Sequence, residues 1–141
     1  MSSETSNNAW HELSRSLEER AKYLERALKE FIINLTSSNY ENVVNGNRTV
    51  IMYFTAEWCG PCINFYKTFK DVAAELLSPG VAFAKVDVDS AYSIADKYQV
   101  RHIPTILIVV DGKVVDSVVG QTSREELAKK LRKYVLTSSA S

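Results

Sequence analysis

The sequence predicts an α/β fold, in which a central mixed β-sheet is flanked by helices and preceded by an extra N-terminal amphipathic helix. Three observations predict it. Segments with strand-like and helix-like apolar spacing alternate along residues 31–136, which is typical of a mostly parallel sheet with helices on both faces. Asp111-Gly112 lies between two apolar runs and indicates a two-residue hairpin, so the last two strands are antiparallel. Before residue 31, apolar residues recur only at helical spacing.

The chain is long enough for one globular domain with its own core, because 45% of its 141 residues are hydrophobic and 24% are charged. We expect this domain at residues 31–136. An N-terminal extension at 1–30 precedes it, with a mobile Ser- and Asn-rich start and then a helix capped by Asn7 or Asn8. A flexible C-terminal tail follows at 137–141.

The elements of the domain follow from apolar spacing and from cap signals. Residues 50–54 form a continuous apolar run of strand length, and Ser123 and Glu126 have the spacing of a capping box. In chain order we expect a strand near 31–35, a helix that opens at Thr36 or Ser37, a strand at 49–55, a helix after Pro61, a strand at 81–88, a short helix at 92–98, strands at 105–110 and 113–119, and a helix from Ser123.

The N-terminal helix carries one apolar stripe, made of Trp10, Leu13, Leu17, Leu24, Leu28 and Phe31. About twenty residues make it roughly 30 Å long. Three partners for the stripe are open: the chain's own domain, which is the simplest, a second copy in a homodimer, or an unrelated protein. A membrane surface is disfavoured, because five basic and six acidic residues leave the segment near neutral.

Charge and cysteine content restrict compartment and partners. Seventeen basic and seventeen acidic residues cancel, so no overall field draws the chain to nucleic acid or to a membrane. We find no apolar run of transmembrane length and no signal-peptide core in the first thirty residues. The two cysteines leave none for a structural disulfide. Together these features favour a cytoplasmic protein.

The chemistry is concentrated in Trp58-Cys59-Gly60-Pro61-Cys62, where a strand-like run gives way to a helix-like one. A helix N-terminus stabilises a thiolate at Cys59, and Cys62 lies one turn further on the same face. Residues three apart on a helix can form a disulfide, so the pair can cycle between dithiol and disulfide. Gly60 and Pro61 add no charge, which favours a reductant over an oxidant.

A structural metal pair is the main alternative for the two cysteines. The chain offers only His11 and His102 as other good zinc ligands, and a closed site needs four. A metal or cluster bridged between two chains stays open. We expect no metal and no bound cofactor, with the redox-active disulfide as the reacting group.

The stretch Phe54-Thr55-Ala56-Glu57-Trp58-Cys59-Gly60-Pro61-Cys62 resembles the thioredoxin family. Three further segments resemble that family in order and at its spacing: Ala84-Lys85-Val86-Asp87-Val88-Asp89 its third strand, Arg101-His102-Ile103-Pro104-Thr105 its cis-proline loop, and Asp111-Gly112-Lys113 its hairpin, with Val119-Gly120 following. The resemblance runs from about residue 31 to residue 135.

The resemblance implies a thioredoxin fold and a protein-disulfide reductase. Cys59 would attack a client disulfide and Cys62 would resolve the mixed disulfide. Electrons would come from a thioredoxin reductase, and the clients would be proteins with disulfides. The resemblance also implies a cis Pro104 and an apolar docking groove made of Trp58, Gly60, Pro61, Ile103, Pro104 and Gly120.

Three residues depart from the family pattern. Tyr53 stands where most thioredoxins have a buried aspartate that assists proton removal from the second cysteine. Because tyrosine is a poor base near pH 7, that proton must leave through water, Lys85 or another route. His102 stands where many relatives have a small residue, and it is either an exposed loop residue or a modulator of Cys59. Ile63 replaces a lysine that often follows the motif.

Two other functions stay open on the sequence alone. The fold can serve as a non-catalytic interaction or assembly module that uses the N-terminal helix. It can also act as an oxidase or isomerase, which the reduction potential of the cysteine pair would distinguish from a reductase.

Overall fold

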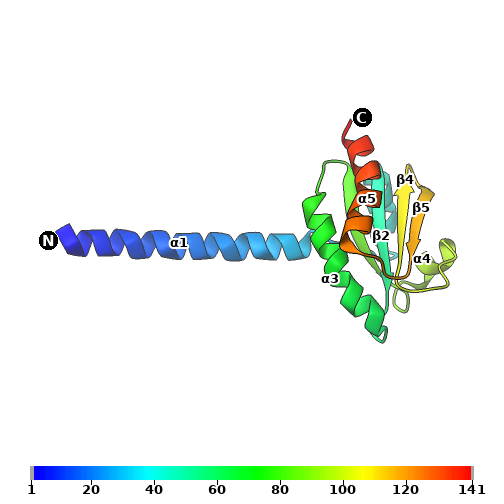
Figure 1. The fold of residues 1–141 in the computed structure, drawn as a ribbon, viewed down its shortest axis with the longest axis horizontal. Coiled ribbons are helices and arrows are strands. Elements are labelled where there is room, and N and C mark those ends of the chain that lie inside the picture. The colour runs from blue at the N-terminus through cyan, green and yellow to red at the C-terminus, as the bar shows by residue number, and fades with distance from the viewer. Residues whose placement is uncertain (1, 141) are drawn as a thin grey trace. The chain divides into compact units, whose positions relative to one another are not determined.

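A computed structural model describes residues 2–140 of the chain. The chain divides into two compact units, with the boundary between Phe31 and Ile32. Within the described residues, the first unit contains helix α1 (Ser2–Glu30), and the second contains five strands and four further helices (Figure 1).

Helix α1 is amphipathic, as the sequence predicts. It begins at Ser2, before the expected cap at Asn7 or Asn8, because residues 2–8 contain no proline or glycine that would stop a helix. Its apolar stripe includes Trp10, Leu13, Leu17 and Leu24, each between 51% and 69% exposed. The side chain of Leu28 lies outside the described residues. The partner that covers the stripe stays a prediction.

The sheet of the second unit is mixed, which confirms the predicted fold class. Its strands are β1 (Ile33–Asn34), β2 (Thr49–Thr55), β3 (Val81–Asp87), β4 (Thr105–Val110) and β5 (Lys113–Val119), in the order β1-β3-β2-β4-β5. The first three strands in the chain run parallel, and β4 runs antiparallel to both β2 and β5. The motif therefore follows the central strand, β2.

Helices cover both faces of the sheet (Figure 1). Successive side chains of β2 point to opposite faces of the sheet. On one face, Val50, Met52 and Phe54 pack with α2 (Tyr40–Gly46) and α4 (Tyr92–Lys97). Tyr53, on the opposite face, contacts aromatic residues of α3 (Gly60–Glu75). The fifth helix, α5 (Arg124–Ala140), contacts α3 and β2. Its backbone is helical over residues 137–140, where the sequence suggests the start of a tail.

Local hydrogen bonds explain where two helices begin. The expected opening of α2 at Thr36 or Ser37 is wrong, because Thr36 and Asn39 bond each other's backbone amides through their side chains and form a turn first. The predicted cap of α5 is confirmed, since the Ser123 hydroxyl accepts from the amide of Glu126 at 3.1 Å.

The predicted hairpin between β4 and β5 is also confirmed. Asp111 and Gly112 have φ values of 51° and 80°, which is the positive-φ pair that a tight hairpin turn requires.

Asp116 connects the edge strand β5 to α5. Its carboxylate accepts hydrogen bonds from the Tyr134 hydroxyl at 2.8 Å and from the Lys130 ammonium at 3.3 Å. Burial alone would raise the pKa of Asp116. The bonds from Tyr134, the Ser117 amide and Lys130 outweigh burial and hold that pKa below its ordinary value of 3.8.

We expect Asp116→Asn to lower the free energy of unfolding by about 1–3 kcal/mol at pH 7, because the variant loses charge-assisted hydrogen bonds. A depressed folded-state pKa stabilises the fold above the unfolded-state pKa, and this contribution is lost as the pH falls through the lower folded value. Urea denaturation over a range of acid pH should therefore show the free energies of unfolding of the two proteins converging as the pH falls. Asp111→Asn is the control, because the side chain of Asp111 is 72% exposed and should contribute little.

Candidate active site

The motif lies at the junction of β2 and α3. Cys59 is the N-cap residue of α3, with an extended backbone, and Pro61 occupies the first helical turn. That turn has free amide groups, so a proline there loses no hydrogen bond. The amide of Cys59 donates to the carbonyl of Ala56 at 3.2 Å, which fixes the entry into the helix.

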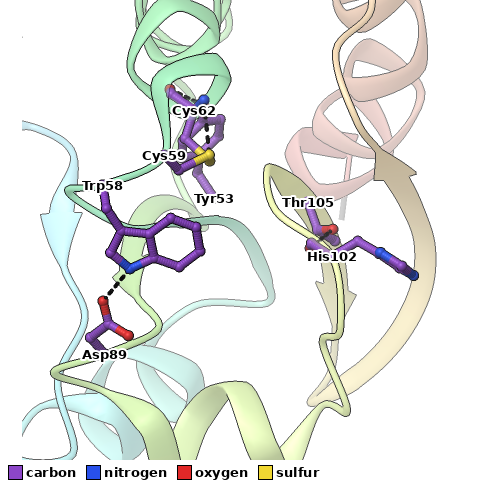
Figure 2. Close-up of a disulfide and its surroundings, with 7 residues drawn as sticks. All are labelled: Tyr53, Trp58, Cys59, Cys62, Asp89, His102 and Thr105. Carbon is purple, nitrogen blue, oxygen red and sulfur yellow. Dashed lines mark hydrogen bonds between the residues drawn. A yellow bond between two sulfur atoms is a disulfide. The ribbon is translucent and has the colours of Figure 1, made fainter.

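The two cysteines form a disulfide with their Cα atoms 5.3 Å apart. The Sγ atom of Cys59 accepts a hydrogen bond from the amide of Cys62 at 3.3 Å (Figure 2). Cys59 is 6% exposed and Cys62 is fully buried. A sulfur at the N-cap, facing free amide groups of the first turn, is a favourable place for a thiolate.

Tyr53 lies directly behind the disulfide and has no exposed surface (Figure 2). Its hydroxyl donates to the carbonyl of Cys62 at 2.5 Å, and its ring lies 4.9 Å from that of Phe69 and 5.3 Å from that of Tyr66. Burial, and to a lesser extent Tyr66, raises the pKa of Tyr53 well above its ordinary value of 10. The phenol is therefore a hydrogen-bond donor and is unsuited to take a proton at neutral pH.

A hollow of about 480 Å³ borders Cys62 and is lined in part by Glu57, Tyr66, Lys85 and Asp87. The Lys85 ammonium lies 4.8 Å from the centre of the Tyr66 ring. The structure thus brings Lys85 to the same hollow as the second cysteine. Sequence reasoning missed Asp87, although β2 and β3 pair in parallel and end side by side at Thr55 and Asp87.

The indole of Trp58 is 70% exposed beside the motif. Its N–H donates to Oδ2 of Asp89 at 2.8 Å, which fixes the ring (Figure 2). Sequence reasoning also missed this role of Asp89, since no local pattern connects residues 31 positions apart.

The cis-proline loop is the other part of the site. The Ile103–Pro104 peptide bond is cis, as the resemblance implies. The amide of Gly120 donates to the carbonyl of Pro104 at 2.8 Å, and Gly120 has a φ of +83°, which disfavours other residues. The Thr105 hydroxyl donates to the carbonyl of His102, whose imidazole points away from the disulfide (Figure 2).

In the reduced protein we expect iodoacetamide to alkylate Cys59 much faster than Cys62 near neutral pH. Cys59 has both the helix N-terminus and the greater exposure, while Cys62 is covered. Mass mapping after a limited reaction measures the order of labelling. Labelling of Cys62 first would contradict the assignment of the attacking thiol.

A family model described as Thioredoxin matches residues 31–133, which include the motif, the sheet and the cis-proline loop. The chain belongs to the thioredoxin family. Its relatives include a Thioredoxin H-type from Oryza sativa subsp. indica, 40% identical over 94 residues that cover 67% of this chain and 75% of the relative. Thioredoxin 2 from Chlorobaculum tepidum is 34% identical over 101 residues, covering 71% and 92% of the two chains.

Solved thioredoxin structures share the fold. A mutant thioredoxin from Halobacterium salinarum NRC-1 matches with a TM-score of 0.64 and 30% identity, covering 74% of this chain and 89% of that one. The crystal structure of thioredoxin from Trypanosoma brucei brucei matches with a TM-score of 0.64 and 31% identity, covering 74% and 90%.

Family membership and the cysteine pair together define the activity. The chain is a thiol-disulfide oxidoreductase of the disulfide-reductase type, and thioredoxins carry the electrons on the cysteine pair itself. Among the described residues, no group of three or more His, Cys, Asp or Glu side chains is placed to hold a metal ion. No helix in the described part of the chain is both long and apolar enough to span a membrane.

Proposed function

We propose that Cys59 is the attacking cysteine and Cys62 the resolving cysteine in the reduction of disulfides in client proteins. The observation that carries this proposal is the N-cap position of the Cys59 sulfur, which accepts the Cys62 amide hydrogen. The Cys59 thiolate attacks a client disulfide and forms a mixed disulfide, releasing one client thiolate. Cys62 then attacks Cys59, closes the disulfide and releases the second client thiolate.

The client would dock on the apolar groove of Trp58, Gly60, Pro61, Ile103, Pro104 and Gly120. The exposed Trp58 ring supports this role because it offers a flat apolar surface beside the disulfide. The cis Pro104 and its bond from Gly120 support it because they hold the backbone of Ile103 in a fixed place. An extended client segment would pair with that backbone in a strand-like manner.

We further propose that a thioredoxin reductase supplies the electrons, that no other cofactor is bound, and that the protein works in the cytoplasm. The restriction of both cysteines to the redox motif supports a reducing compartment. Insulin reduction with a thioredoxin reductase and its nicotinamide donor tests the whole cycle. Many turnovers per molecule are expected, and a single stoichiometric reduction would contradict the proposal.

An oxidase or isomerase of the same fold is tested by the reduction potential of the pair. The uncharged Gly60 and Pro61 favour a reducing couple. Equilibration with glutathione should leave the pair mostly oxidised, whereas a pair that stays reduced under these conditions would support the oxidase.

Helix α1 is an accessory in this proposal, because the strands and helices from Ile32 onward form a unit of their own. We expect deletion of residues 1–27 to leave a folded, active reductase.

The same deletion tests what covers the apolar stripe. If the helix folds back onto the domain, the full-length protein should be a monomer, and deletion should cost a few kcal/mol of stability, at ~25 cal/mol per Å² of apolar area exposed. A homodimer through the stripe predicts a parent mass that halves on deletion. Light scattering measures the mass and denaturation measures the stability, and together they distinguish the two arrangements. A truncated protein that cannot fold would contradict the accessory role of α1.

A further inference from the structure

The second step of the reaction requires Cys62 to lose a proton. An ordinary thiol has a pKa of about 8.5, so at pH 7 only a few per cent of such groups are thiolates. A group that accepts the proton therefore accelerates the closing of the disulfide. This inference rests on the reductase reaction proposed above and concerns where that proton goes.

The inward route from Cys62 is closed. Tyr53 already donates its own proton to the Cys62 carbonyl, and its pKa is raised by burial. The rings of Phe65 and Phe69 lie 6.1 Å and 4.9 Å from the Tyr53 ring and make this side of the motif apolar.

The hollow beside Cys62 provides an outward route. Its volume of about 480 Å³ exceeds by far the roughly 30 Å³ that one water occupies in the liquid. In the disulfide form Cys62 forms part of the wall but exposes no surface. The transfer therefore belongs to the mixed-disulfide stage, when the bond between the two cysteines is open.

Four titratable side chains besides Cys62 line this hollow: Glu57, Tyr66, Lys85 and Asp87. A lysine ammonium has no lone pair to accept a proton, and burial raises the pKa of the Tyr66 phenol. Glu57 is exposed and Asp87 is half-buried, and both also border the neighbouring hollow beside Trp58. The greater exposure of Glu57 leaves its carboxylate less fixed than that of Asp87.

Asp87 is held in place at the end of β3. Its Oδ1 atom accepts hydrogen bonds from the amides of Asp89 at 2.9 Å and Ser90 at 3.2 Å. No bond to its Oδ2 atom is described among residues 2–140, and the side chain is half-buried. The fixed carboxylate thus has one oxygen available to water in the hollow.

We propose that Asp87 is a positioning residue that orients water in this hollow to accept the Cys62 proton. The Cys62 sulfur attacks Cys59, the bond between Cys59 and the client sulfur breaks, and the client leaves with the bonding electrons. The Cys62 proton passes to water held by Asp87 and then to solvent, where the client thiolate can take it up. No oxidant or reductant beyond the client mixed disulfide is needed.

The test follows the two thionitrobenzoate releases when reduced protein reacts with dithiobis(nitrobenzoate) in a stopped-flow instrument. The first release reports attack by Cys59, and the second reports closing by Cys62. We expect Asp87→Asn to slow the second release by roughly tenfold near pH 7, which is less than the loss of a direct general base would cause, because water lies between Asp87 and the thiol. This loss should shrink as the pH rises past about 8.5, where the thiol ionises unaided. The first release should not change.

The asparagine keeps an oxygen for the amides of Asp89 and Ser90, so the turn should stay intact. Asp96→Asn in α4 is the charge-matched control, since Asp96 does not line the hollow, and it should leave both releases unchanged. An equal loss at every pH, no loss, or a loss in Glu57→Gln instead would overturn the proposal. A parent protein without a first release would contradict the reductase function itself.

Discussion

Replacement of Cys62 by serine is expected to reduce insulin-reducing turnover by roughly a thousandfold or more and to accumulate a mixed disulfide on Cys59. The intramolecular thiol acts at an effective concentration far above that of any external thiol, and serine cannot replace it. The Cα atoms are 5.3 Å apart in the disulfide, so little backbone movement is needed for the step that the variant loses. Turnover assays and mass spectrometry of the protein under non-reducing conditions measure the two effects.

The matched variant is Cys59→Ser, which removes the other sulfur. It should lose turnover to the same extent without accumulating a client adduct, because the remaining Cys62 is fully buried. A client adduct on Cys62 in that variant would show that the roles of the two cysteines are reversed.

The second large effect is expected for Tyr53→Asp, which should lower the free energy of unfolding at neutral pH by about 3–5 kcal/mol. The change removes a fully buried ring that contacts Phe65, Tyr66 and Phe69, and it leaves a cavity. It also places a carboxyl group where burial disfavours its charged form. Urea denaturation measures the difference.

The pH dependence of the stability of Tyr53→Asp separates the effect of the cavity from the effect of the charge. Burial should raise the folded-state pKa of the new carboxyl group above its unfolded value of about 3.9. The charge penalty is therefore absent below that value, grows as the pH rises from it toward the folded-state pKa, and stays constant above the folded-state pKa. Tyr53→Phe is the control, since it keeps the ring and loses only the bond to the Cys62 carbonyl, at a cost of about 1 kcal/mol. Equal stability of Tyr53→Asp and Tyr53→Phe would contradict the buried position of the Tyr53 side chain.

Elements with a strong local signal could be predicted from the sequence. Strands β2, β4 and β5 have the expected bounds, because continuous apolar runs and the Asp111-Gly112 turn fix them without help from the rest of the chain. The cysteine motif is equally local. Its place at the start of α3 follows from the strand-like run before it and the helical spacing after it.

Features that depend on the assembled sheet could not be predicted. Strand β1 has two residues and is defined by its pairing with β3, so its apolar sequence overstates its length. The contribution of Asp87 to the hollow depends on β2 and β3 ending together, and Asp89 reaches Trp58 across 31 positions. The bond from the Tyr53 hydroxyl to Cys62 likewise exists only after α3 packs on the sheet.

The N-cap position of Cys59 has a consequence for the conditions under which this protein can work. Its sulfur accepts a hydrogen bond from the backbone amide of Cys62, a group that does not titrate in the biological range, whereas a neighbouring histidine or carboxylate would. At 6% exposure the sulfur is also shielded from dissolved ions, so ionic strength screens this interaction weakly. This stabilisation of the Cys59 thiolate therefore needs no titratable side chain, and acid or salt should weaken the interaction less than they weaken an exposed ion pair.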